Sequence, residues 1–296
     1  MEPVFLLSST GCVPTSRLRT ERIGRDGALT LAFDRRGAQT ILTERRFTLP
    51  FQVLEPVSLH DDGFAYLTLL NPTGGLVGGD RLEANIILNA GARVCLTTPS
   101  ATKVYRTLGP PAVQRIGIRV DADAVIEYVP DHVIPYPGSA FHQYLQIELA
   151  ERSRALIYDA FAVGRVARGE RWAFKEFINR TAVTLNGRPI FLDRFELDQS
   201  VIKERGFGGM ENYGYIATVG LFAESFCAWN ELAHRLQKEL RDIPSVASGV
   251  SLLARCGCIV RVLAPSAVHL GDVTRKIWAL AREALLGLPV CDLRKF

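Results

Sequence analysis

The chain has 296 residues, of which 48% are hydrophobic and 22% are charged, and its net charge is +4. This composition is ordinary for a globular protein of one large domain or two average ones, and the charge is too small to indicate a nucleic-acid partner. No apolar run approaches the length of a membrane span, and no basic segment precedes the short run Val4–Leu7 as it would in a signal peptide. We therefore expect a cytoplasmic protein that binds neither nucleic acid nor membrane.

The first unusual segment along the chain is Asn71–Asp80. Four of six successive positions in it are glycine, namely Gly74, Gly75, Gly78 and Gly79. This density predicts a positive φ angle for at least one of them, or the close approach of another group. A phosphate-binding loop or a dinucleotide fingerprint would open a helix, whereas the pattern that follows is that of a strand. We interpret the segment as a tight turn or as a loop that packs against a partner, with Asp80 capping it or facing an internal polar space.

Alternating apolar residues predict half-buried strands through the first two thirds of the chain. The period of two runs through Leu82–Leu88, Ile116–Val120 and Leu145–Leu149. Farther along, Asn186-Gly187 separates two strand-like segments, and this dipeptide favours a tight hairpin because both residues accept the positive φ angles of a type I′ turn.

A weak internal repeat runs through the same region. The segments Leu88–Leu96, Val120–Tyr128 and Leu149–Ile157 resemble one another at offsets of 32 and 29 residues. Each reads as a strand, a tight polar turn and a second strand. Stacked layers of a β-solenoid would give this pattern, as would a folded β-sandwich, and three similar arches can also arise by chance.

The last third of the chain predicts two amphipathic helices. Ser225–Ile243 and Ser266–Gly287 carry apolar residues at helical spacing, and strands are expected between them at Val250–Leu253 and Cys258–Ala264. We interpret both apolar stripes as core. The predicted fold is therefore mainly β, with solenoid-like stacked strands and a small C-terminal α+β part containing two helices. We treat 1–296 as a single domain, with a strand-rich body at 15–215 and the C-terminal part at 216–296.

The cysteines offer one weak metal-site candidate. Cys256 and Cys258 would share one face of a strand, where two thiolates could bind a soft metal. The competing interpretation is a buried strand in which cysteine acts as a small apolar residue, and we favour it because no other cysteine or histidine lies nearby in sequence.

Patterns typical of catalysis are missing from the sequence. There is no His-Glu-x-x-His, no Gly-x-Ser-x-Gly and no pair of carboxylates whose spacing marks an acid–base couple. The residues alone therefore predict a protein that is not an enzyme.

Several segments together resemble the urease accessory protein family UreD, also called UreH. The loop Asn71–Asp80 and the segment Thr97–Arg106 are similar to that family's NPPGGLVGGD-like loop and TTP-x-ATK-x-Y-R-like strand, at the same separation. Other matches follow in order over residues 15–290, at Phe33–Gly37, Glu127–Pro130, Gly164–Glu170, Gly187–Arg194, Val260–Ala264 and Leu285–Pro289. Thr73 stands where the family usually has proline, and the segments Asp131–Pro135 and Cys291–Phe296 also depart from its pattern.

The resemblance implies a mainly β solenoid and a function without catalysis. Proteins of this family bind apo-urease and recruit UreF, which recruits the GTPase UreG, so that nickel is inserted into the urease active site. It implies no permanently bound cofactor, nickel at most in transit, and a scaffolding or chaperone role. We further expect the two C-terminal helices and the edges of the β region to present one large apolar surface to a UreF-like protein, with Trp229, Trp278 and Phe296 near it.

The same resemblance selects candidate site residues. The glycine loop with Asp80 would bind a partner or shape the fold. Asp80, Lys103, Asp159 and Asp193 would line an internal polar path for the ion if they are buried, and otherwise they would form structural salt bridges. Two other functional classes remain open, a β-solenoid carbohydrate-active enzyme and a stand-alone metal-binding protein.

Overall fold

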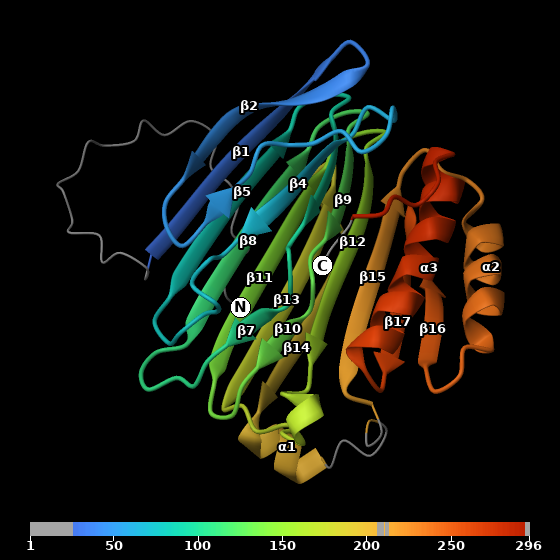
Figure 1. Cartoon of the computed structure of the whole chain (residues 1–296). Helices are drawn as coiled ribbons and strands as arrows, with labels where there is room; N and C mark the ends of the chain where they lie inside the picture. Colours follow the sequence, from blue (N-terminus) through green and yellow to red (C-terminus); the bar gives the residue numbers. More distant parts are fainter. Residues whose placement is uncertain (1–25, 206–209, 211–212, 294–296) are drawn as a thin grey trace.

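The computed structural model describes residues 26–205, 210 and 213–293, and it consists mainly of two β-sheets stacked face to face (Figure 1). The first sheet has the order β14-β13-β11-β8-β5-β1-β2. Its strands are β1 (Asp26–Arg36), β2 (Gln39–Phe47), β5 (Arg81–Leu88), β8 (Ala112–Val120), β11 (Ala140–Leu149), β13 (Glu176–Leu185) and β14 (Arg188–Asp198).

The second sheet has the order β16-β17-β15-β12-β9-β6-β4-β3. Its strands are β3 (Gln52–Val53), β4 (Ala65–Leu70), β6 (Arg93–Thr97), β9 (Val125–Val129), β12 (Arg154–Ala162), β15 (Tyr215–Ala223), β16 (Ala247–Leu252) and β17 (Gly257–Ala264). Two short strands, β7 (Thr102–Val104) and β10 (Val133–Pro135), pair with each other, and β10 also pairs with β12.

The predicted repeat is confirmed as the rungs of a solenoid. Leu88, Val120 and Leu149 lie opposite one another in the parallel strands β5, β8 and β11, as Arg93, Val125 and Arg154 do in β6, β9 and β12. The residue three places after each member of the first set closes the arch with a positive φ. These residues are Gly91 at 73°, Asp123 at 60° and Arg152 at 56°. The repeat is therefore structural, although no single residue type occupies the arch position.

The other strand predictions are also confirmed. The segments with period two form β5, β8 and β11, whose apolar residues face the space between the sheets. Asn186 and Gly187, with φ angles of 48° and 73°, join β13 to β14 as the expected hairpin. The inner core between the two sheets is aliphatic and aromatic, and its fully buried members include Phe33, Ile86, Phe141, Phe174 and Phe177.

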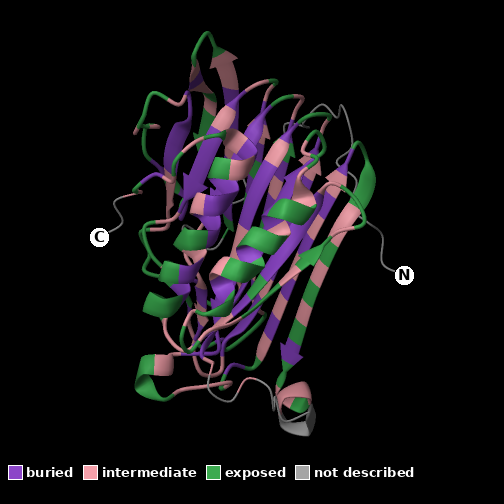
Figure 2. Cartoon of the chain, turned by 90° about the vertical axis from the view of Figure 1, so that its right-hand side faces the viewer, coloured by how far each residue is buried: buried purple, intermediate pink, exposed green. Residues whose placement is uncertain are grey.

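The two predicted helices exist and cover the outer face of the second sheet (Figure 2). They are α2 (Trp229–Arg241) and α3 (Ala267–Leu286). The hydroxyl of Ser266 accepts a hydrogen bond from the backbone N–H of His269 at the start of α3, and Gly287 ends the helix with a φ of 66°. A third helix, α1 (Gln199–Arg205), was not predicted, and neither was the short 3-10 turn η1 (Val166–Arg168).

The expectation of a large apolar surface on the C-terminal helices is wrong. Leu232, Leu236 and Leu240 of α2 are buried, and Trp278 of α3 is only 8% exposed. These side chains cover the second sheet, whose strand β15 is buried on both faces. Trp229 packs partly buried against the same core, and Phe296 lies outside the described residues. Within the part of the chain that the structure describes, no helix has both the length and the hydropathy needed to cross a bilayer.

Candidate functional site

All the long connections between rungs lie at one end of the solenoid, which we call the loop end. They are the segments 71–80, 98–111, 130–139 and 163–175, each leading from the second sheet back to the first. They gather at the lower end of Figure 1, near α1, whereas tight arches close the upper end. The glycine loop and the matching segments Thr97–Arg106 and Gly164–Glu170 therefore share one end of the molecule, although they are up to about a hundred residues apart in sequence.

The glycine loop has the conformation that its composition predicts. Gly74, Gly75 and Gly79 have φ angles of 80°, 156° and 86°. A Cβ on Gly75 would lie 2.6 Å from the carbonyl oxygen of Lys103, and a Cβ on Gly78 would lie 2.7 Å from Cγ2 of Thr107. Gly75 is thus required both by its backbone angle and by the neighbouring chain, whereas Gly78 is required by its close neighbour alone, because the loop packs directly on the next rung.

Asp80 holds the loop from within. Its side chain is buried, and Oδ2 accepts a hydrogen bond of 2.8 Å from the backbone N–H of Val77. The backbone N–H of Asp80 in turn donates to the Val77 carbonyl, and its own carbonyl accepts from Val113 at the start of β8. Of the two roles expected for Asp80, the structure supports capping of the turn.

An aromatic and ionic chain joins the loops to one another. The Tyr105 hydroxyl donates to the Gly74 carbonyl over 3.2 Å, and its ring meets the Tyr136 ring edge-on at 5.1 Å. The Arg165 guanidinium lies 4.4 Å from the centre of the Tyr136 ring and forms a two-pronged ion pair with Glu170. The loop end is therefore a built surface. The contacts of Tyr136 with Tyr105 and Arg165 could not be predicted from the sequence, because ring contacts between loops leave no periodic pattern.

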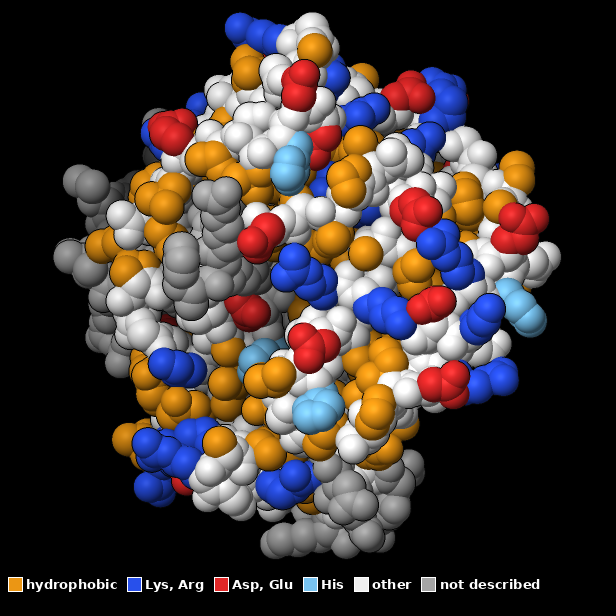
Figure 3. Space-filling view, turned by 45° about the vertical axis from the view of Figure 1, so that its right-hand side comes forward, with side chains coloured by type: hydrophobic (Ala, Val, Ile, Leu, Met, Phe, Trp, Pro, Cys, Tyr) orange, Lys and Arg blue, Asp and Glu red, His pale blue; other side chains and the backbone are white. Residues whose placement is uncertain are grey.

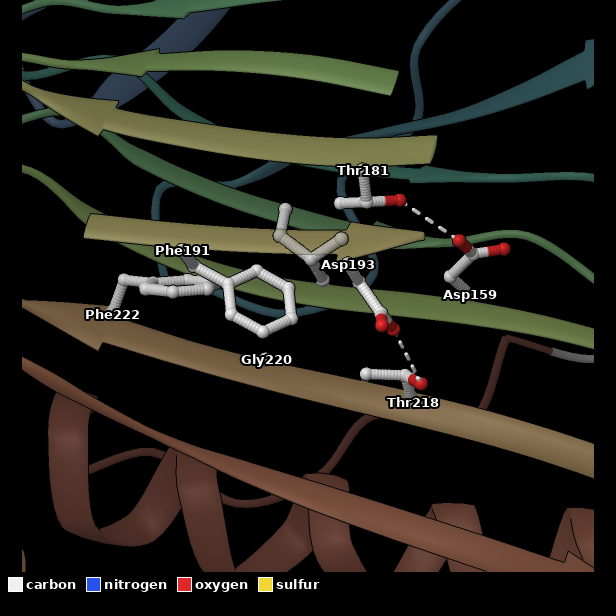
Figure 4. Close-up of a pocket in the computed structure, with 8 residues that line it drawn as sticks. Asp159, Thr181, Phe191, Asp193, Thr218, Gly220 and Phe222 are labelled. Carbon is white, nitrogen blue, oxygen red and sulfur yellow. Dashed lines mark hydrogen bonds between the residues drawn. The ribbon is translucent and has the colours of Figure 1, made fainter. Parts of the chain in front are cut away.

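A second candidate site is a small pocket between the sheets (Figure 4). Asp159 from β12 and Thr181 from β13 lie on one side of it, and Asp193 from β14 and Thr218 from β15 lie on the other. Asp159 accepts hydrogen bonds from Gln143, from Asn179 at 2.8 Å and from Thr181 at 2.9 Å. The pocket has room for about one water molecule.

The two carboxyl groups of this pocket have different surroundings. Burial raises the pKa of Asp159, and the negative charge of Asp193 adds to this effect, while the hydrogen bonds from Asn179 and Thr181 oppose it. Asp193 is paired with Arg261, whose Nη2 lies 2.8 Å from Oδ1, and it accepts from Thr218 at 3.2 Å. The two carboxylates and the hydroxyl groups of Thr181 and Thr218 are the oxygen donors of this pocket, and the remaining lining side chains, such as Phe191 and Phe222, are apolar.

The structure brings together only two of the four residues proposed for a polar path. Asp159 and Asp193 share the pocket. Asp80 belongs to the glycine loop, and the exposed side chain of Lys103 lies on β7, so neither lines the pocket.

A buried polar network fixes α3 to the second sheet, and the sequence did not predict it. Arg282 is fully buried, and its guanidinium lies 3.2 Å from Glu127 and 3.1 Å from Asp62. Trp278 donates to Glu127 over 2.9 Å, and the Tyr66 hydroxyl donates to Asp62. The one signal in the sequence was an arginine four residues after a tryptophan, within the apolar stripe of a helix.

The proposed thiolate site is not formed. Cys256 lies in the turn before β17 and packs toward the inner core, whereas Cys258 is buried in the outer core beneath the helices. Burial raises the pKa of Cys258 to about 12, which disfavours the thiolate that a metal would need. Among the described residues, no three His, Cys, Asp or Glu side chains are grouped to hold a metal ion.

Comparison with known proteins gives a consistent result over almost the whole chain. The family model of the UreD urease accessory proteins matches residues 25–295. The urease accessory protein UreD of Alkalilimnicola ehrlichii is 32% identical over 287 residues, which cover 97% of this chain and 96% of that protein. The UreD protein of Delftia acidovorans is 31% identical over 282 residues, which cover 89% of this chain and 91% of that protein. The UreD protein of Herpetosiphon aurantiacus is 32% identical over 275 residues, which cover 91% of this chain and 95% of that protein.

Proposed function

The chain belongs to the UreD family of urease accessory proteins and so has a role in urease maturation, and from this premise we propose its specific task. It acts in the cytoplasm as a scaffold without catalytic activity. It binds urease apoprotein and recruits a UreF-like protein, and through that protein a UreG-like GTPase, so that nickel is inserted into the urease active site.

The observation that supports this proposal most is the construction of the loop end. Three of the four loops carry family motifs, in Asn71–Asp80, Thr97–Arg106 and Gly164–Glu170. Backbone bonds tie the loops to one another, for example from Leu76 to the Lys103 carbonyl and from Tyr136 to the Val104 carbonyl. Preorganised loops on a rigid scaffold are suited to binding another protein with little loss of conformational entropy.

The pocket of Asp159 and Asp193 adds a second element to the proposal. We assign to it a transient contact with nickel on its way to urease, with the ion as cargo and not as a resident cofactor. Because the pKa of Asp159 is raised, a proton competes with the cation for this carboxylate, and such competition favours weak and reversible binding.

Co-expression tests the proposal directly. Urease apoprotein would be produced with the UreF-like and UreG-like proteins, in the presence or absence of this chain, and its nickel content measured after purification. We expect nickel insertion to require this chain, and the tagged chain to retain both urease apoprotein and the UreF-like protein. Equal nickel contents with and without the chain would contradict the proposal.

A further inference from the structure

The loop Thr107–Pro111 presents one apolar side chain almost entirely to solvent. Leu108 is 90% exposed, more than any other large hydrophobic side chain in the described part of the chain. Val77, which is 46% exposed, lies nearby, because the next residue, Gly78, packs against Thr107. Isolated exposed leucines are common on protein surfaces, so exposure alone decides nothing.

What distinguishes Leu108 is the rigidity of its support. The backbone N–H of Thr107 donates to the Gly138 carbonyl over 3.1 Å, and the Thr107 hydroxyl accepts from Ala140 over 2.9 Å. On the other side of the tip, Gly79 donates to the Pro111 carbonyl over 3.3 Å, and two successive prolines restrict the chain. The backbone on both sides of Leu108 is therefore anchored before any partner arrives, which lowers the entropic cost of docking this loop.

The charges around this tip have one sign. In the four loops of the loop end, the exposed charged side chains are all cations, namely Lys103, Arg106, Arg168 and Lys175. The acidic side chains of these loops are buried or half-buried, and Glu170 is paired with Arg165. Figure 3 shows basic and hydrophobic side chains next to one another at the lower end of the face that it draws.

Backbone bonds place the cations on adjoining segments. Ile134 of β10 lies opposite Lys103 of β7, and Gly138, which receives the bond from Thr107, donates to the Ala173 carbonyl. Lys175 donates to the Ser139 carbonyl. The apolar tip and the basic side chains therefore belong to one connected surface.

We propose that this surface is a docking site in which Leu108 enters an apolar pocket on a folded protein partner, and the surrounding cations face a rim of carboxylates on that partner. The inference rests on the proposed function and deepens it by assigning a face and a partner chemistry. A protein fits better than a nucleic acid, because an aliphatic anchor fills an apolar pocket, whereas single-stranded nucleic acid is bound by stacking on aromatic rings.

Binding measurements on the full chain test this assignment. The tagged chain is titrated with purified urease apoprotein and, separately, with the UreF-like protein, at low and at high salt. For one of these partners we expect Leu108→Asp to weaken binding at least roughly 30-fold, as replacement of a central anchor does. Charge reversal with Lys103→Glu and Arg106→Glu should lower the affinity and flatten its salt dependence for the same partner.

The control is Leu192→Asp, which places the same charge on a leucine that is 72% exposed on the outward face of β14, where it lies opposite Ala182 and away from the four loops. Thermal unfolding of each variant verifies that its fold is intact, and Leu108→Ala serves if Leu108→Asp does not fold. Unchanged affinity of the folded Leu108 variants for both partners would overturn the docking site while leaving the proposed function standing. An equal loss with Leu192→Asp would overturn it as well. A wild-type chain that binds neither partner would overturn the proposed function, and the docking site with it.

Discussion

Trp278 of α3 donates its indole N–H to Oε1 of Glu127 in β9 over 2.9 Å, joining residues 151 positions apart in the sequence. Glu127 is almost fully buried, and it faces Arg282 from the same helix. A carboxylate in such a place costs free energy unless it is paired, so this contact links the position of the C-terminal helix to the ionisation of one side chain.

The first prediction concerns the pH dependence of folding. Burial raises the pKa of Glu127 to about 7 from an ordinary value of 4.5, against the opposing effects of Arg282 and Trp278. Because the folded protein holds this proton more tightly than the unfolded chain does, the stabilisation is complete below pH 4.5 and is lost as the pH rises through about 7. We expect the loss to be about 3 kcal/mol.

Glu127→Gln tests this dependence, since glutamine keeps an acceptor for Trp278 and does not titrate. Unfolding midpoints of the two proteins would be measured in denaturant from pH 5 to pH 8. The wild type should lose stability relative to the variant across this range. A constant difference between the two would show that Glu127 does not titrate there.

A second prediction concerns Arg282. Arg282→Ala leaves Glu127 and Asp62 buried without their cation, and we expect the free energy of unfolding to fall by roughly 3–5 kcal/mol. The matched control is Arg235→Ala, which breaks the exposed ion pair with Glu283 at 2.7 Å and should cost less than about 1 kcal/mol. Chemical denaturation at constant pH measures both, and similar losses would contradict the importance of the buried network.

The glycine loop gives a third prediction. Gly75→Ala adds a Cβ 2.6 Å from the Lys103 carbonyl, which cannot move freely because it accepts a hydrogen bond from Leu76. We expect a loss of roughly 1–3 kcal/mol in the free energy of unfolding and weaker partner binding. Gly249→Ala is the control, since nothing lies within 4 Å of its Cβ position and it lies on β16, outside the docking surface. Equal stability of the two variants would show that the loop adapts.

The fourth prediction separates transit of nickel from a purely structural pocket. Asp159→Asn and Asp193→Asn remove one carboxylate each, and either should lower the nickel content of co-expressed urease several-fold while the chain still binds its partners. Glu196→Gln, on the outward face of β14 and paired with Arg180 and Arg194, is the control. Full nickel content with folded Asp159 and Asp193 variants would leave only the structural role.

Local patterns were sufficient to predict most elements of this fold. The alternation in β5, β8 and β11, the turn at Asn186-Gly187 and both long helices follow from side-chain periodicity and backbone preference. The seven-residue helix α1 has no apolar period, and it starts where the Asp198 carboxylate accepts from the backbone N–H groups of Ser200 and Val201.

It was harder to predict what the apolar faces of the two long helices pack against. Strand β15 is an almost unbroken apolar run, which is typical of a strand covered on both faces. That run was the available sign that α2 and α3 cover this sheet rather than offer their apolar faces to a partner. The contacts of Glu127 with Arg282 and of Asp159 with Asp193 depend on how the sheets stack, which no local pattern encodes.

The two ends of the solenoid differ in how they join the strands. The arches at one end fix the pairing of the strands, whereas the loops at the other end form the surface that we propose for partner binding. Each arch in 89–92, 121–124 and 150–153 has four residues, so a change of length there would offset the strand that follows it from its parallel neighbours. The loops at the other end lie between the long strands, and the strands named within them are only the short β7 and β10. Exchanges of exposed side chains at that end, such as Leu108, do not touch the pairing of the long strands, so the surface there can change while the scaffold keeps its register.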